Sequence, residues 1–308
     1  MRRIRIVAHG ARADEPTLRQ VVHRLRELKC EVVVRPTWEA GDAEVLALEG
    51  FDRGADLIVA AGGDGTTNDV LNGLLRADAT VPLGIIPLGT ANDFAGSAGL
   101  PTTPRAIADL LARGAPRPVD VARVEERYFI NAATGGFAAE ATGTAPAGLK
   151  RALGGLAYFL TGVARLSSVD EREIFIEGPG FEWSGSYLGF AVTNARTAGG
   201  GHRICPGAMI DDGLLDLVVL PGNTSLIEAA HMAADFKFEP TEDNVRRWRA
   251  PWINVLLPEG ATLNIDGESR KLRQARFEVF RRGIEVMLPD DCPLIRPPSG
   301  VQRMRTVL

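Results

Sequence analysis

The sequence predicts an α/β protein in two parts, a wound sheet of parallel strands followed by a mainly antiparallel β-sandwich. Up to about residue 120, short apolar runs alternate with stretches of helical periodicity, which is typical of parallel βαβ units. Beyond that point, many short apolar runs are joined by turns that contain Gly or Pro, which favours antiparallel strands. Glycine-rich loops directly follow two of the early runs, at the position where parallel sheets bind ligands.

The elements of the first part follow from the spacing of apolar residues. Between residues 16 and 29, Leu18, Val21 and Leu25 recur at helical spacing, whereas residues 31–35 form a β-branched run. The same reasoning predicts the remaining elements: strands at 4–8, 57–60 and 83–86, and helices at 42–53, 68–76 and 104–113.

The second part is predicted to consist mainly of short strands. One helix-like stretch covers residues 149–166, and its uncharged portion 152–164 is either a core helix or one wall of a lipid cleft. Turns with a glycine at 258–260 and 282–283 would each separate two strands. Strands are expected at 119–124, 128–133, 173–177, 187–194, 214–220, 252–257, 261–266, 276–281 and 284–288.

Composition excludes several classes of function. The chain has 308 residues, and its formal net charge of −4 argues against a nucleic-acid-binding protein. Its three cysteines form no C-x-x-C pair, so we expect neither a zinc site nor a disulfide framework. No apolar run approaches the ~20 residues that cross a bilayer, and the N-terminus resembles a strand rather than a signal peptide. The basic run 246–249 is either a small membrane contact or an exposed charge cluster.

The most informative segment is the loop after the strand predicted at 57–60. It brings Gly62, Gly63, Asp64, Gly65 and Thr66 together ahead of a helix. Glycines let the backbone approach a bulky anion, and a helix N-terminus offers free N–H groups to it. The Asp64 carboxylate suits a metal ion or a transferring phosphoryl group, although a plain strand-to-helix turn also often contains glycine. The loop matches neither a Walker A loop nor a dinucleotide fingerprint.

A second loop, residues 87–94, follows the strand predicted at 83–86. It contains Gly89 and Thr90, and the Thr90 hydroxyl can donate to a phosphate or a nucleotide. Asn92 and Asp93 can also be explained as simple helix caps. Because both loops follow parallel strands, we expect them at the same edge of the sheet.

Two acidic segments lie in the second part. Asp266 and Glu268 flank a glycine at a strand end, where a carboxylate could accept a hydroxyl proton during phosphoryl transfer. Asp-Gly is also typical of the tip of a β-hairpin. Asp211, Asp212 and Asp216 could hold a hard cation such as Mg²⁺, or they are turn acids.

Together these segments resemble the diacylglycerol kinase catalytic family, which also includes sphingosine and ceramide kinases. The similarity is closer still to its bacterial YegS-type lipid kinases. The signature is the pair of loops 62–66, Gly-Gly-Asp-Gly-Thr, and 87–94, Pro-Leu-Gly-Thr-Ala-Asn-Asp-Phe. The resemblance covers most of the chain, since further similar segments are found at 37–42, 133–137, 198–201 with 205–206, and 291–294.

The resemblance implies two domains. Residues 1–122 would form an ATP-binding domain like that of NAD kinases and phosphofructokinases, and residues 123–290 a β-sandwich domain for the lipid substrate. Residues 291–308 would pack back on the first domain. ATP contacts would fall on Thr37, Gly63, Asp64, Gly65, Thr66, Thr67, Asn68, Asp69 and Thr90.

The resemblance also implies catalytic roles. Glu268 would accept the proton of the lipid hydroxyl, and Asp64 would act on the phosphates through Mg²⁺. A second cation, Mg²⁺ or Ca²⁺, would be held by the backbone carbonyls of Met209 and Leu214 and by the carboxylate of Asp212. The turn at 8–12 departs from the Asn-Pro-x-x-Gly pattern of many members, and Asp69 stands where Glu is common.

The sequence therefore predicts an ATP-dependent lipid kinase that moves a γ-phosphoryl group to a hydroxyl of a phosphatidylglycerol- or diacylglycerol-like lipid. Such an enzyme would be cytoplasmic, would touch the inner membrane surface transiently and would bind no nucleic acid. A kinase of a soluble acceptor, similar to NAD kinase, and a non-catalytic nucleotide or lipid sensor are the alternatives. The sequence predicts no oligomeric state.

Overall fold

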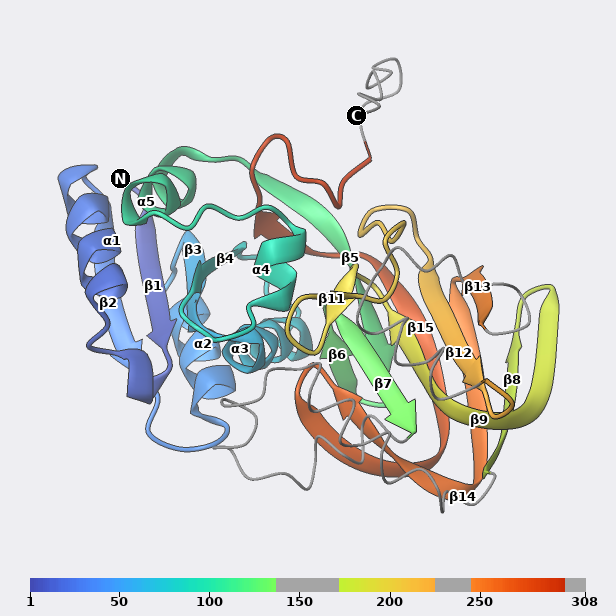
Figure 1. Cartoon of the computed structure of the whole chain (residues 1–308). Coiled ribbons are helices and arrows are strands. Elements are labelled where there is room, and N and C mark those ends of the chain that lie inside the picture. Colours follow the sequence, from blue (N-terminus) through green and yellow to red (C-terminus); the bar gives the residue numbers. More distant parts are fainter. Residues whose placement is uncertain (137–171, 225–244, 297–308) are drawn as a thin grey trace.

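The computed structural model describes residues 1–136, 172–224 and 245–296 (Figure 1). The helix expected at 149–166, with its uncharged stretch, and the chain beyond residue 296 lie outside the described residues. Within the described part, helices and strands alternate up to residue 113, and only strands follow, as the sequence predicts. No helix in these ranges combines the length and the apolarity needed to cross a membrane.

The first part is a wound sheet of four parallel strands in the order β4-β3-β1-β2. Its strands are β1 (Arg3–Ala8), β2 (Glu31–Pro36), β3 (Leu57–Gly62) and β4 (Leu83–Pro87). The short turn η1 (Gly10–Arg12) follows β1. The helices are α1 (Pro16–Glu27), α2 (Asp42–Asp52), α3 (Asp64–Arg76), α4 (Asp93–Ser97) and α5 (Pro104–Arg113).

Helices cover both faces of this sheet (Figure 1). On one face, Leu18 of α1 and Leu111 of α5 join Ile4 and Ile6 of β1 in one buried cluster. On the other face, Val7 of β1 belongs to the cluster formed with α2 and α3. Successive side chains of a strand point to opposite faces, so a strand covered on both faces is largely apolar, as in β3, which is buried at every position.

The second part consists of antiparallel strands. The longer ones are β5 (Pro116–Val124), β8 (Arg172–Gly178), β9 (Phe181–Thr193), β12 (Leu215–Pro221), β14 (Trp252–Ile265) and β15 (Glu268–Met287). The shorter ones are β6 (Arg127–Phe129), β7 (Ala132–Gly136), β10 (Thr197–Ala198), β11 (His202–Arg203) and β13 (Arg246–Ala250).

This antiparallel part folds over on itself because β9 and β14 are bridged twice. Strand β7 pairs with both of them near one end of β14, at 263–265, and β8 pairs with both near the other end, at 254–256. The folded sheet encloses a core of its own, which includes Phe129, Phe277 and Val192. The fold class predicted from the sequence, a wound α/β sheet and a β-sandwich, is therefore confirmed.

Strand β15 joins the two parts. Its residue Val286 lies beside Leu83 of β4 in parallel pairing, so hydrogen bonding runs from the first sheet into the second. After β15 the chain returns to the first part, where Cys292, Leu294 and Ile295 are buried in the cluster beneath α2 and α3.

Two turns predicted from the sequence are wrong. Strand β14 continues through 258–260 and strand β15 through 282–283. In each strand the pairing register shifts instead, between Leu256 and Ala261 and between Phe280 and Ile284. These are bulges, in which one strand carries several extra residues without ending.

Candidate active site

The carboxyl ends of the four parallel strands form one edge of the first sheet. Ala8 at the end of β1 lies beside Pro36 of β2 and Ala61 of β3, and Gly62 lies beside Pro87 of β4. Ligands of wound sheets bind outside this edge. The residues that follow the four strands therefore lie in one row: Thr37, His9, Gly63 and Leu88.

The two glycine-rich loops contact each other through their backbones, as expected for neighbouring strand ends. A Cβ on Gly63 would lie 3.2 Å from the Cα of Gly89, and a Cβ on Gly89 would overlap the Cα of Gly63. Leu88 also donates its N–H to the carbonyl of Gly62 at 2.8 Å. Beside Gly65, by contrast, a Cβ would find no heavy atom within 4 Å. The start of α3 thus faces open space, which suits a bulky anion such as a phosphate chain.

Asp64 ties the two loops together. It is the first residue of α3, and its carboxylate accepts the N–H of Asp93 at 3.0 Å and of Phe94 at 3.2 Å, at the start of α4. Burial raises the pKa of Asp64, and these N–H donors act in the opposite direction. Each carboxylate oxygen has a second acceptor position, so Asp64 retains capacity for a further ligand.

Three of the predicted nucleotide contacts point inward. Thr66, Thr67 and Asn68 are buried, and the Thr67 hydroxyl donates to the carbonyl of Gly63 at 3.2 Å. Any contact that they make with a nucleotide would therefore run through backbone N–H groups in the first turn of α3. Thr90, by contrast, is exposed.

The turn after β1 supports Thr37 even though it departs from the pattern of the resembled family. Gly10 donates its N–H to the Thr37 hydroxyl at 3.0 Å. A Cβ on Gly10 would overlap the Thr37 carbonyl oxygen, so this close approach requires glycine. The predicted contact residue Thr37 is thereby held in the row at the sheet edge.

Asp266 fixes the hairpin that carries Glu268. Its carboxylate accepts the N–H groups of Ile130 at 2.9 Å, Asn131 at 3.2 Å and Ala132 at 2.8 Å. Burial raises the pKa of Asp266 to about 7, and these N–H donors act against that rise. The hairpin between β14 and β15 is thus attached to the connection between β6 and β7.

Arg127 links Glu268 to helices α2 and α3 of the first part. Its guanidinium group contacts the carboxylates of Glu44 in α2, Asp69 in α3 and Glu268 in β15, with an Asp69 distance of 2.7 Å. Glu268 and Asp69 therefore share one cation across the two parts of the chain. The sequence interpretation missed Arg127 by placing it in a polar turn, although it directly precedes the apolar run 128–130.

Asp93 is a second functional candidate that sequence reasoning missed, because it was explained as a helix cap. Its carboxylate accepts the N–H groups of Gly200, at 3.0 Å, and of Gly201. Asp93 is buried, and its own N–H donates to the Asp64 carboxylate. The glycine-rich segment 199–201 of the second part is therefore fastened to α4 at the same edge.

The acids proposed for a second cation each have a cationic partner. Asp212 forms an ion pair with Arg249 and accepts the N–H of Leu214 at 3.0 Å. Asp216 also pairs with Arg249, at 3.1 Å, and Asp211 pairs with Arg296 at 3.3 Å. A divalent ion bound by Asp212 would have to compete with the Arg249 guanidinium.

Among residues 1–136, 172–224 and 245–296, no group of three or more His, Cys, Asp or Glu side chains is arranged to hold a metal. The side chain of Met209 lies near Arg196, whose Nη2 donates to its sulfur at 3.2 Å. The basic run 246–249 forms most of β13, where Trp248 stacks on Phe181 with ring centroids 5.1 Å apart. This run is therefore part of the sandwich.

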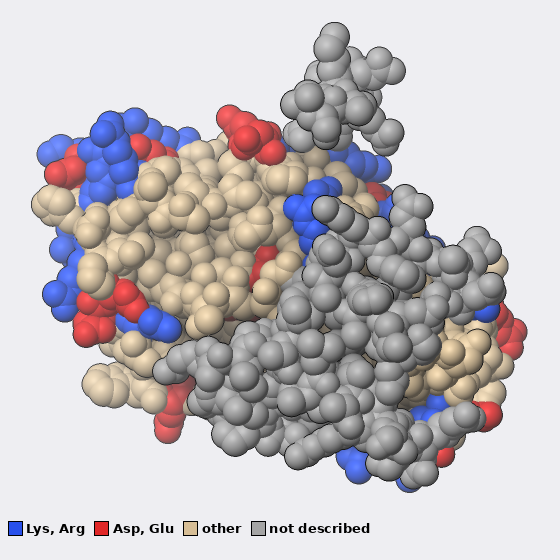
Figure 2. Space-filling view, in the orientation of Figure 1, with Lys and Arg blue, Asp and Glu red and all other residues tan. Residues whose placement is uncertain are grey.

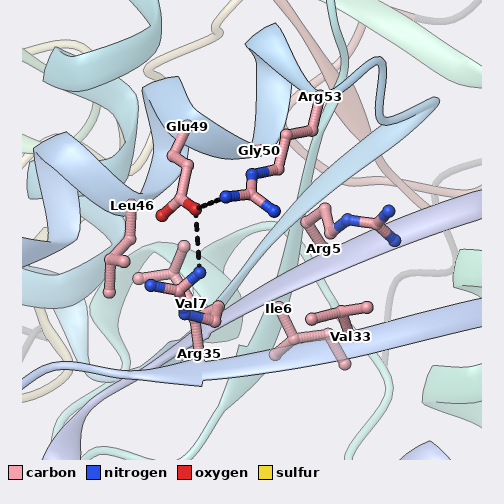
Figure 3. A pocket seen from close by; sticks show the side chains of 9 residues that line it. All are labelled: Arg5, Ile6, Val7, Val33, Arg35, Leu46, Glu49, Gly50 and Arg53. Carbon is pink, nitrogen blue, oxygen red and sulfur yellow. Dashed lines mark hydrogen bonds and ion pairs between the residues drawn. The ribbon is translucent and has the colours of Figure 1, made fainter.

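A separate small pocket lies beneath α2, against β1 and β2 (Figure 3). Arg5, Arg35 and Arg53 line it, and Glu49 pairs with Arg35 at 2.9 Å and with Arg53 at 2.8 Å. None of the predicted site residues lines it. Figure 2 shows that, on one face of the first part, basic and acidic side chains surround a centre that is uncharged apart from a small acidic patch.

Two family models match this chain. The one described as diacylglycerol kinase catalytic domain matches residues 6–124, and the one described as YegS C-terminal NAD kinase beta sandwich-like domain matches residues 132–288. Curated relatives agree over nearly their full lengths. A protein of Stenotrophomonas maltophilia named "Probable lipid kinase YegS-like" is 40% identical, with 95% of this chain and 98% of the relative covered.

A protein of the same name from Pseudomonas aeruginosa is also 40% identical, with 96% of this chain and 97% of the relative covered. Among solved structures, one from Bacillus anthracis str. Sterne has a TM-score of 0.82 at 25% identity and covers 94% of this chain and 96% of that chain. Another, described as a diacylglycerol kinase from the same organism, has a TM-score of 0.75 at 22% identity, which shows the fold alone.

Proposed function

The chain belongs to the diacylglycerol kinase family of lipid kinases, and from that premise we propose that it transfers the γ-phosphoryl group of ATP to a lipid hydroxyl. The observation that carries the proposal is the Arg127 contact, which places Glu268 next to Asp69 in α3. Glu268 of the sandwich, the proposed proton acceptor, thereby lies beside α3, whose first turn would hold the phosphates. Phosphoryl transfer to an alcohol requires a proton acceptor close to the bound phosphates.

In this proposal the phosphates of ATP lie over the start of α3. The open space beside Gly65 and the free N–H groups of the first helical turn support that placement. Thr37 and the exposed Thr90 would contact the nucleotide from the neighbouring loops. Because these groups are fixed by the sheet edge, they would orient the phosphates before the reaction rather than during it.

Glu268 would accept the proton of the lipid hydroxyl as the oxygen attacks the phosphorus. Its hairpin is fixed by Asp266, and its side chain is 40% exposed, so a lipid headgroup can reach it. A divalent ion such as Mg²⁺, when bound, would neutralise the charge of the phosphates. The remaining acceptor positions of Asp64 fit such an ion, whereas the Asp212 carboxylate already has a cation beside it.

We assign residues 1–122 to nucleotide binding and residues 123–290 to the lipid, with phosphatidylglycerol- or diacylglycerol-like molecules as acceptors. The lipid would be taken up from a membrane surface. On the face shown in Figure 2, basic side chains of the described residues are interspersed with acidic ones. On this face, the described residues therefore offer an anionic membrane no broad basic field.

The test is transfer of radiolabel from γ-labelled ATP to a panel of lipids in detergent micelles with Mg²⁺. Wild type should label one lipid class, and Glu268→Gln should lower its turnover by about 10²- to 10⁴-fold with ATP binding nearly intact. Glu278→Gln is the matched control, because Glu278 lies on the same strand and pairs with Arg123 outside the site.

Wild-type turnover in Glu268→Gln would remove Glu268 from the mechanism. Labelled soluble acceptors without labelled lipid would indicate a kinase of the NAD kinase type. ATP binding without any transfer would indicate a nucleotide or lipid sensor.

A further inference from the structure

We propose that Arg127 is a positioning residue, which holds the Glu268 carboxylate against α3 in the orientation that proton transfer requires. The inference rests on the proposed role of Glu268 as proton acceptor. Arg127 lies on the short strand β6, and its side chain contacts acids from both parts of the molecule.

The backbone around Arg127 is fixed to α3. The side-chain amide of Asn72 donates to the carbonyl of Tyr128 at 2.9 Å and accepts the N–H of Tyr128 at 2.9 Å. Asn72 is fully buried and also donates to the carbonyl of Asn68 at 2.8 Å, within α3. Arg127 directly precedes Tyr128, so α3 fixes the backbone position from which the Arg127 side chain extends.

The guanidinium group of Arg127 is the centre of a charge network. Its side chain is only 5% exposed, whereas the side chains of Glu44, Asp69 and Glu268 are 22%, 32% and 40% exposed. A buried guanidinium cannot lose its proton and must be paired. Its planar fork, unlike a point charge, also fixes the direction of the carboxylates that it binds.

The network is balanced in charge. Arg76 pairs with Glu44 at 3.0 Å, and Arg270 lies 3.8 Å from Glu268. The arginines 76, 127 and 270 thus match the acids Glu44, Asp69 and Glu268 in number. Arg127 alone among these arginines contacts acids from both parts of the chain.

The position of the Glu268 hairpin does not depend on Arg127. Asp266 fastens that hairpin independently, through the N–H groups of Ile130, Asn131 and Ala132. Loss of Arg127 would therefore leave the hairpin in place and release the Glu268 side chain, together with those of Glu44 and Asp69 on the first part. A glutamate side chain has three rotatable bonds, so its carboxylate would then sample orientations in which the lipid hydroxyl is out of reach.

The experiment compares Arg127→Gln, Arg127→Lys, Glu268→Gln and the double variant Arg127→Gln/Glu268→Gln with wild type. We expect Arg127→Gln to lower kcat by about 10- to 100-fold while the KM for ATP changes by less than about twofold. Arg127→Lys, which keeps the positive charge, should recover part of kcat. In the Glu268→Gln background, Arg127→Gln should cause no further loss, because Arg127 acts through Glu268.

Arg123→Gln is the matched control. Arg123 lies on the adjacent strand β5 and pairs with Glu278 at 2.8 Å, so its loss removes an Arg–Glu pair outside the site. Its kcat should stay within about twofold of wild type. A rise in the KM for ATP with unchanged kcat in Arg127→Gln would make Arg127 a nucleotide contact and overturn the proposal. A further loss of kcat in the double variant would also overturn it.

Melting temperatures of the same variants separate this proposal from the proposed function. If wild type transfers no phosphoryl group to lipid, the proposed function fails, but the pairing of Arg127 with Glu268 is still tested. Non-additive shifts in melting temperature across the single and double variants support the pairing. Additive shifts overturn it whatever the activity.

Discussion

Gly63 and Gly89 lie so close that a side chain at Gly89 would overlap the backbone of the other loop. A Cβ on Gly89 would overlap the Cα of Gly63, and the reverse addition would reach within 3.2 Å of the Gly89 Cα. The two glycine-rich loops are thus one structural unit at the end of β3 and β4. The conformation of the proposed phosphate site depends on this unit.

We predict that Gly89→Ala lowers the free energy of unfolding by about 1–3 kcal/mol, because the methyl group would force the loops apart. Denaturant titration measures the change. Gly96→Ala in α4 is the matched control, since a Cβ there meets no atom within 4 Å. That variant should be as stable as wild type or more stable, as for glycine replacement within a helix. Equal stability of Gly89→Ala and wild type would contradict the close contact.

Gly65→Ala should lower ATP affinity without lowering stability. The added methyl group meets no atom within 4 Å, so stability should not fall. The same methyl group would occupy the space that we assign to the phosphates, and we expect ATP affinity to fall by about tenfold or more. Calorimetric titration with ATP measures the effect. Unchanged affinity would place the phosphates elsewhere.

Asp64→Asn should weaken the contact between the loops and abolish transfer. One oxygen that accepts an N–H of Asp93 or Phe94 would become an NH₂ group facing that donor. We expect the free energy of unfolding to fall by about 1 kcal/mol. Lipid labelling should be lost altogether, which is more than this loss of stability would cause. Labelling at the wild-type rate would exclude Asp64 from the reaction.

The buried carboxyl of Asp266 should make stability depend on pH. Its pKa in the folded protein is raised by burial to about 7, so the folded state binds this proton more tightly than the unfolded state. This contribution to stability is complete below the unfolded pKa of about 4 and is lost as pH rises to about 7. The unfolding free energy of wild type minus that of Asp266→Asn, measured from pH 4 to 8, should fall as pH rises toward 7, because Asn does not titrate. A pH-independent difference would contradict the raised pKa.

Arg249 should limit cation binding at Asp212, because guanidinium and metal would compete for the same carboxylate. We predict that Mg²⁺ raises the melting temperature of Arg249→Gln by a few degrees more than that of wild type. Adding Asp212→Asn to Arg249→Gln should remove the extra rise. Equal Mg²⁺ effects in wild type and Arg249→Gln would argue against a cation at Asp212.

Much of the fold was accessible from local patterns. The apolar spacing of Leu18, Val21 and Leu25 predicts α1, because a helix with one buried face carries apolar residues at helical spacing, and the β-branched run 31–35 predicts β2. The two glycine-rich loops could also be placed at one edge of the sheet, because the carboxyl ends of parallel strands meet there. The turns expected near Gly260 and Gly283 were wrong, because glycine also occurs in bulges within a continuing strand.

The sequence by itself determined the wound sheet, the sandwich, the two loops and the acids that the family resemblance singles out. Only the tertiary structure decided that Arg127 joins Asp69 to Glu268, and that Asp93 receives the backbone of Gly200 and Gly201. These contacts join residues more than 50 positions apart, as between Asp69 and Arg127 at a separation of 58. Periodicity reports only which face of an element is buried. The partner of a buried charge is set by how whole elements pack, and no local spacing encodes it.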